Sequence, residues 1–312
     1  MVDVLQHVTV LRDAAVDALS VKSDGVYVDG TYGRGGHSEK LLEQLGSDGC
    51  LLVIDKDPTA IADARSKFKS EPRVFVFHGS FADLDQALEG NDLPKTFDGL
   101  LLDLGVSSPQ IDDGDRGFSF QRDGALDMRM NPEEGISAAA WIASASESEM
   151  MDVLWKYGDE RFARRIVKSI VSERDEKPLQ TTLQLANLIS AAVPRKFHGK
   201  KHPATKSFQA IRIFINKELA DLEQCLEVAV EKLNPGGRLV VISFHSLEDR
   251  MVKRFFKKQS SPAPIPRGLP IQDENLLMPF KVIGKAVKPD VDEVAENVRS
   301  RSSVMRILER CA

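Results

Sequence analysis

The chain has 312 residues, 42% of them hydrophobic, so it can bury a large core in one elaborated domain or two. A net charge of −5 argues against a protein that coats nucleic acid without selection. No apolar run approaches the roughly 18 residues needed to span a bilayer, and the N-terminus lacks a signal-peptide pattern. The three cysteines are far apart, without metal-ligand spacing. We therefore expect a cytoplasmic protein with no membrane association and no metal.

A glycine-rich turn follows the first predicted strand. The apolar residues 26–28 end in Asp29, and the turn at residues 30–36 leads into an amphipathic segment. A strand that turns tightly into a helix leaves backbone N–H groups at the helix start, and glycines let a ligand lie against the main chain. The turn therefore predicts half of a nucleotide or nucleoside pocket, although its glycines could serve only to make the turn possible.

The second half of this pocket is predicted at Asp55. This acid ends the apolar run 51–54, which is typical of a buried parallel strand, and it lies about 20 residues past the glycine turn. A carboxylate there can accept hydrogen bonds from both ribose hydroxyls. The alternative is that Asp55 caps the helix that starts near Pro58, but Asp57 is better placed for that role.

Strand and helix patterns alternate along the first hundred residues, which indicates a parallel sheet with right-handed crossovers. The predicted strands are 26–29, 50–55, 74–78 and 99–103, and the predicted helices are 38–45, 58–68 and 81–88. The alternation breaks after residue 105. Four helical segments follow, near residues 137–143, 147–157, 161–174 and 183–193, with an apolar stripe at Phe162, Ile166 and Ile170.

The α/β pattern then resumes with one long helix over residues 208–233, which the Pro-Gly-Gly turn at 235–237 ends. A strand at 238–243, a helix at 247–257 capped by Ser246 with Asp249, and strands at 280–286 and 303–308 complete the pattern. This order is typical of S-adenosylmethionine-dependent methyltransferases. We therefore expect an α/β fold: a Rossmann-like class I methyltransferase sheet (residues 1–105 and 206–312) with an inserted helical domain (residues 106–205).

The segment after the fourth strand carries the predicted chemistry, because ligands of open parallel sheets lie at the carboxyl ends of the strands. Methyltransferases that modify exocyclic amino groups carry a short polar, proline-containing motif here, and this chain has Ser107, Ser108 and Pro109. The amino lone pair is delocalised into the base, so hydrogen-bond acceptors that favour pyramidalisation direct it at the methyl group. The alternative is a Ser-Pro turn that leads into the insert.

A basic segment joins the insert to the predicted long helix. Residues 195–217 hold seven basic side chains and no acid, which suggests a docking site for one polyanion or, on charge alone, a solvated loop. The residues expected to contact RNA are Arg195, Lys196, Lys200, Lys201 and Lys206. His198 and His202 are four residues apart, but no acid or cysteine supports a metal site there.

Several motifs together make the chain similar to the bacterial 16S rRNA cytosine-N4 methyltransferase family. They are residues 29–38, 101–110, 116–120, 126–130, 202–205, 242–250, 294–297 and 301–303. The resemblance runs from about His7 to Arg310. It implies methylation of N4 of cytidine 1402 in the decoding centre of the small ribosomal subunit, S-adenosylmethionine as methyl donor, and a helical insert that helps to recognise the substrate.

The same resemblance implies donor-binding roles for Gly35, Gly36, His37, Asp55, Phe81, Asp103 and Gln110. Together with Gly33, the turn residues would meet the methionine end, Phe81 would cover the adenine, and Asp103 would lie beside the sulfonium. The alternatives are that Asp103 is a strand-end cap and that His37 is only a helix-start residue. No aromatic follows Pro109, so we hypothesise that Phe118 and Phe120 stack on the target base. The alternative for both is anchoring of their loop.

Three functions remain at this stage. The rRNA amino-methyltransferase is favoured. A DNA or free-nucleotide amino-methyltransferase would keep the Ser-Ser-Pro loop but has no evident use for the insert and the basic segment. A non-enzymatic ribosome-assembly factor that retains the donor pocket is the third.

Overall fold

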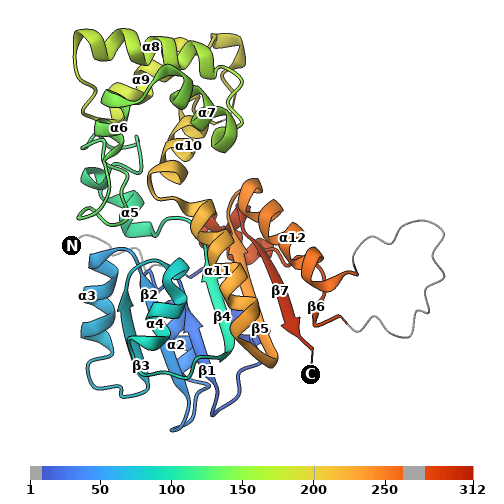
Figure 1. Ribbon diagram of the computed structural model, residues 1–312. Helices are drawn as coiled ribbons and strands as arrows, with labels where there is room; N and C mark the ends of the chain where they lie inside the picture. Colours follow the sequence, from blue (N-terminus) through green and yellow to red (C-terminus); the bar gives the residue numbers. More distant parts are fainter. Residues whose placement is uncertain (1–8, 200, 263–277, 312) are drawn as a thin grey trace, which may run out of the picture. The chain divides into compact units, whose positions relative to one another are not determined.

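The computed structural model describes residues 9–199, 201–262 and 278–311 (Figure 1). The chain divides into two compact units, unit 1 (Met1–Gly105 with Ala220–Ala312) and unit 2 (Val106–Leu219). The second boundary lies at residue 219 and not at the expected residue 205. The reason is that α10 (Thr205–Ile215) buries Phe208 and Ile211 in the hydrophobic core of unit 2.

Unit 1 is built on one seven-stranded sheet with the order β3-β2-β1-β4-β5-β7-β6. Strands β1 to β5 are parallel, and β7 is antiparallel to both β5 and β6. The predicted Rossmann-like fold class is thereby confirmed. The strands are β1 (Val26–Asp29), β2 (Cys50–Asp55), β3 (Val74–His78), β4 (Phe97–Asp103), β5 (Leu233–Ser243), β6 (Phe280–Val282) and β7 (Val304–Arg310).

Two hydrophobic clusters cover the two faces of this sheet, because successive side chains of a strand point to opposite faces. Leu51 and Val53 pack with α1 (Arg12–Ala18), α2 (Gly36–Leu42) and α3 (Pro58–Lys67). Leu52 and Ile54 pack on the opposite face with α4 (Leu84–Glu89), α11 (Glu218–Lys232) and α12 (Ser246–Ser260) (Figure 1). Burial on both faces explains why the strands are continuous apolar runs.

Unit 2 is helical and has a core of its own. Trp141, Leu154 and Leu185 are buried in it, and the predicted stripe contributes the buried Ile166 and Ile170 with Phe162 packed against them. The elements are α5 (Ser108–Asp112), α6 (Ala138–Ser144), α7 (Glu147–Gly158), α8 (Ala163–Glu176), α9 (Thr182–Ala192) and α10, with 3-10 turns η2 (Gly114–Arg116) and η3 (Arg195–Phe197). No helix in the described part of the chain is both long and apolar enough to cross a membrane.

The expected single helix over residues 208–233 is wrong, since it breaks at Asn216 and Lys217 into α10 and α11. The buried Asn216 side chain donates to the carbonyl of Met128 (2.7 Å) and accepts from the N–H of Met130 (2.7 Å). Lys217 adopts a left-handed backbone with φ of 54°. These tertiary hydrogen bonds override a continuous apolar period.

The predicted cap of α12 is also wrong. His245, and not Ser246, is the N-cap, and its partner in the capping box is Glu248. Strand β6 ends at Val282, earlier than predicted, and α1, α5 and α13 (Val291–Glu296) were not predicted. These short elements lack the length that makes a helical period readable from sequence.

Candidate active site

Asp29, at the end of β1, fixes both ends of the glycine turn. It is fully buried and accepts hydrogen bonds from the N–H of Thr31 (3.1 Å) and from Oγ of Ser38 (2.6 Å). Burial raises the pKa of its carboxyl group. Thr31 in turn accepts at Oγ1 from the N–H of Asp103 (2.6 Å), so β1, α2 and the end of β4 are held together. The sequence alone indicated no role for Asp29 or Thr31.

The turn itself requires glycine at two positions. Gly33 and Gly35 have φ of +56° and +79°. A Cβ on Gly35 would lie 2.7 Å from the ring of Tyr32, whose hydroxyl donates to Asp63 (2.7 Å). Larger residues would be strained at these positions. Glycine avoids this strain, and because it has no side chain, the backbone can lie close to a ligand at this edge of the sheet. Gly36 begins α2 directly after the turn.

Asp55 connects the end of β2 to this turn. Its Oδ2 accepts from the N–H of Gly33 (2.8 Å) and its Oδ1 from the N–H of Asp57 (2.8 Å). Asp57 is the N-cap of α3 and accepts from the N–H of Thr59 (2.9 Å), so Asp55 is not that cap. Each carboxylate oxygen of Asp55 keeps a second lone pair for a ligand. Burial raises the pKa of Asp55 to about 6 although both hydrogen bonds favour its ionised form.

His37 and Asp103 place unsatisfied polar atoms at the same edge. The His37 side chain is 4% exposed, and its Nε2 lies 3.6 Å from Oδ2 of Asp103, too far for a hydrogen bond. Within the described ranges, both ring nitrogens of His37 and Oδ1 of Asp103 are buried and have no hydrogen-bond partner. Such atoms destabilise a fold unless a ligand or water satisfies them, so they fit a polar small molecule.

Phe81 lies after β3 in the short turn η1 (Phe81–Asp83), which is held by an acid on α11. Ser80, the N-cap of this turn, accepts from the N–H of Ala82 (3.1 Å) and donates to Oδ2 of Asp221 (2.5 Å). Asp221 also forms an ion pair with Lys56, the residue after Asp55. Asp221 therefore ties together the loops that carry Phe81 and Asp55. No motif in the sequence pointed to it.

The residues predicted to position the target amino group belong to unit 2. Ser107 is the N-cap of α5, which begins with Ser108 and Pro109. The N–H of Ser107 donates to Oε1 of the buried Gln110 (2.9 Å). The side chain expected to bind the donor thus also orders the loop predicted to contact the acceptor.

The two predicted stacking residues differ in their surroundings. The ring of Phe120 lies 4.7 Å from that of His202 and 4.8 Å from that of Phe208, between centroids, and it packs on the core of unit 2. These contacts support the anchoring alternative for Phe120. Phe118 is half-buried, and the guanidinium carbon of Arg116 lies 5.8 Å from its ring centroid.

Most of the predicted RNA-contacting side chains are exposed in unit 2. They are Arg195, Lys196, Lys201 and Lys206, whereas Lys200 lies outside the described residues. Lys206 donates to the carbonyl of Asp159 (3.0 Å). Among the other basic residues of the segment, Arg212 is paired with Glu218 (2.8 Å), so the available charge is smaller than the sequence suggests. Backbone groups engage both nearby histidines, His198 through the carbonyl of Val193 and His202 through the N–H of Ala204.

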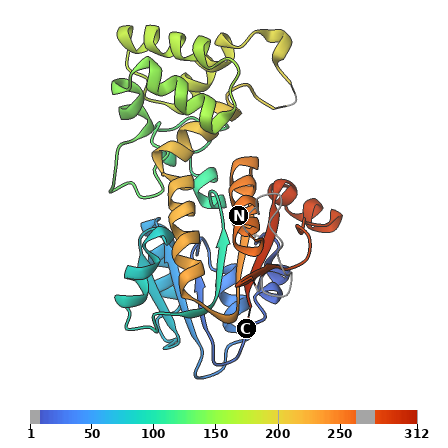
Figure 2. The ribbon, with the colours of Figure 1, turned by 45° about the vertical axis from the view of Figure 1, so that its right-hand side comes forward.

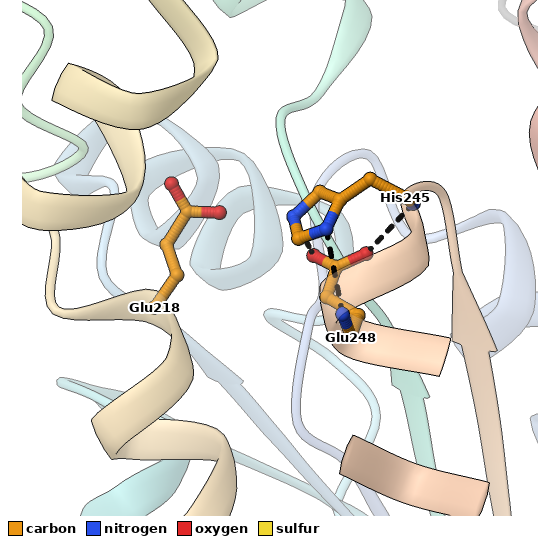
Figure 3. A group of neighbouring side chains, drawn as sticks. All are labelled: Glu218, His245 and Glu248. Carbon is orange, nitrogen blue, oxygen red and sulfur yellow. Dashed lines mark hydrogen bonds and ion pairs between the residues drawn. The ribbon is translucent and has the colours of Figure 1, made fainter. Parts of the chain in front are cut away.

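Glu248 fixes the start of α12 at the carboxyl end of β5 (Figure 3). Its Oε2 accepts from the N–H groups of Phe244 (2.9 Å) and His245 (3.2 Å), and its Oε1 lies 3.1 Å from Nε2 of His245. Figure 3 also draws Glu218, which begins α11 and pairs with Arg212 within unit 2. The carboxylate of Glu248 is thus committed to capping its helix.

Comparisons with known proteins identify the family of this chain. The profile of the MraW methylase family matches residues 4–311. Ribosomal RNA small subunit methyltransferase H of Neisseria meningitidis serogroup B is 52% identical over 308 residues, covering 98% of this chain and 93% of that protein. The protein of the same name from Chromohalobacter salexigens is 53% identical over 306 residues, covering 98% of this chain and 92% of that protein. A crystal structure of an rRNA methylase from Streptococcus thermophilus aligns with a TM-score of 0.41 at 10% identity, covering 96% of this chain and 94% of that one. The chain belongs to the MraW methylase family.

Proposed function

We propose that this methylase transfers a methyl group from S-adenosylmethionine to N4 of cytidine 1402 in 16S rRNA, in the decoding centre of the small ribosomal subunit. The proposal rests on one edge of the sheet in unit 1. There the Asp55 carboxylate can accept further hydrogen bonds, and buried polar atoms of His37 and Asp103 have no hydrogen-bond partner among the described residues. The curated relatives are named for the small-subunit rRNA, which supports that substrate. The sequence motifs shared with cytosine-N4 methyltransferases support the amino group of cytidine as the group that is methylated. The site of action is then the cytoplasm, where small subunits assemble.

The residues of unit 1 would hold the donor. Asp55 accepts hydrogen bonds from the ribose hydroxyls, and Phe81 covers the adenine. The glycine turn with His37 meets the methionine end, which supplies the unsatisfied nitrogens of His37 with partners. Asp103 lies beside the sulfonium, where its acidic side chain attracts the cationic donor more strongly than the product, whose sulfur is uncharged. When bound, the sulfonium supplies an electrophilic methyl group.

The residues of unit 2 would hold the acceptor. Ser107, Ser108 and the carbonyls beside Pro109 accept hydrogen bonds from the amino group, and this favours the pyramidal geometry in which its lone pair can attack. Phe118 stacks on the extruded base. The methylated amino cation is strongly acidic, so bulk water takes its proton and no strong general base is needed.

The basic side chains of unit 2 would bind RNA phosphates. The exposed Arg195, Lys196, Lys201 and Lys206, together with Lys200, form the proposed contact. The helical unit would thus act as the substrate-recognition domain. Since contacts to phosphates carry no sequence information, the choice of cytidine rests with the loop at residues 107–120.

Incubation with methyl-labelled donor and unmethylated small subunits tests the proposal, with naked 16S rRNA in parallel and with mass spectrometry of the nucleosides. We expect label in N4-methylcytidine and a preference for assembled subunits. An absence of label, together with donor binding measured by calorimetry, would contradict a methyltransferase function and favour an assembly factor that retains the donor pocket.

A further inference from the structure

Helix α12 carries a row of basic side chains along one exposed face. They are Arg250, Lys253, Arg254, Lys257 and Lys258, and no acid lies among residues 250–258. Their spacing of three and four residues places them on a single stripe that is about 12 Å long at the usual rise of a helix. We call these five residues the α12 stripe.

The opposite face of the helix is used for packing. Glu248, Val252 and Phe256 are buried, and the last two join the hydrophobic cluster that covers the sheet. The stripe therefore points away from the sheet to solvent. The helix itself runs alongside the strands (Figures 1 and 2).

Within the described ranges, none of the five stripe residues forms an ion pair or a hydrogen bond through its side chain. The acids at the start of α12 do not neutralise them. Glu248 caps the helix, and Asp249 pairs with Arg306 (2.7 Å). Among the described residues, no acid therefore pairs with the stripe, on a chain whose net charge is −5.

This arrangement works against the stability of the helix. Like charges three or four residues apart repel one another, and the stripe contains five such pairs. The helix dipole compensates Lys257 and Lys258 in the last turn but not the charges in the first half. A polyanion bound along the stripe would remove the repulsion, and the release of its counterions would favour binding.

We propose that the α12 stripe binds the phosphate backbone of the rRNA substrate, as a contact surface on unit 1 itself. The inference rests on the proposed function. Helix α12 begins at the carboxyl end of β5, and β5 pairs with β4, the strand that ends in Asp103. When the target nucleotide of an RNA lies at the carboxyl ends of β4 and β5, the phosphates of its neighbouring nucleotides are within reach of the first turns of α12.

The triple variant Lys253→Gln, Arg254→Gln and Lys257→Gln tests the proposal. Binding to a single-stranded RNA carrying the target cytidine and to unmethylated small subunits is measured between 50 and 300 mM salt. Each lost phosphate contact reduces the slope of log K against log salt by about 0.7, so the slope should fall by about 2. Donor affinity should not change.

A second triple variant is the matched control. Arg65→Gln, Lys69→Gln and Lys95→Gln remove the same charge from exposed positions outside α12, and their slope should equal that of the wild type. Equal slopes for the two triple variants would overturn the proposal, as would a loss of binding to phosphatidylserine vesicles without a change in RNA binding. A wild-type protein that neither binds nor methylates RNA would instead refute the proposed function.

Discussion

We expect the affinity for the donor to depend on pH through the carboxyl group of Asp55. Burial raises this pKa to about 6, and we expect only the ionised carboxylate to accept hydrogen bonds from both ribose hydroxyls. At pH 7.5 nearly every molecule is ionised, whereas at pH 5 about one in eleven is. The dissociation constant for the donor should therefore rise about tenfold from pH 7.5 to pH 5.

Calorimetry with S-adenosylhomocysteine measures this change, since the amino and carboxyl groups of that ligand do not titrate in the range. The sign follows from linkage: binding favours the ionised carboxylate, so affinity is complete above pH 6 and is lost as pH falls through 6. Below pH 6, binding should release a proton, which appears as a dependence of the binding heat on the buffer.

Two variants assign the effect to one residue. Asp55→Asn should bind about 10-fold more weakly or worse at pH 7.5, because a hydrogen bond to a charged group is worth about 1.5–3 kcal/mol, and its affinity should not vary with pH. His37→Gln changes a neighbouring side chain of the same turn and should keep the wild-type pH dependence. If Asp55→Asn shows the same fall in affinity as the wild type, the assignment to Asp55 is wrong.

Three further predictions follow from contacts within single units. Asp221→Ala should weaken donor binding by about 5- to 30-fold in calorimetry, because it frees the loops that carry Phe81 and Asp55. Turnover at saturating donor should be nearly unchanged, and a fall in turnover alone would argue against this role. Phe118→Ala should lower turnover on saturating subunits by about tenfold through lost stacking, whereas Phe120→Ala should lower the thermal stability and spare turnover. Asn216→Ala should lower the free energy of unfolding by about 2–3 kcal/mol in denaturant titration, since it leaves buried backbone groups unpaired, and an unchanged midpoint would contradict that account.

The sheet and the polar residues at the ends of its strands were predictable because their causes are local. The buried parallel strands are continuous apolar runs, and each ends in or near a polar residue that returns to one edge of the sheet. Asp55 was chosen from its position after such a strand. The structure removes the competing N-cap interpretation, because Asp57 caps α3.

Other features depend on partners that are distant in sequence. The break at Asn216 requires hydrogen bonds to residues 86 and 88 positions earlier, which no helical period reveals. Asp221 gains its role only where α11 meets two loops that follow β2 and β3. The cap of α12 was misassigned because a histidine nitrogen can replace the usual hydroxyl when a glutamate completes the box. The roles of Ser107, Ser108, Pro109 and Gln110 stay predictions.

The proposed reaction methylates one amino group in the small subunit. Small subunits carrying cytidine or uridine at position 1402 can be incubated with the protein and labelled donor, and the nuclease fragments can then be analysed by mass spectrometry. We expect one methyl group on N4 of cytidine 1402, in the fragment that contains it, and none on the uridine subunits. Label elsewhere, or equal label on the uridine subunits, would contradict it.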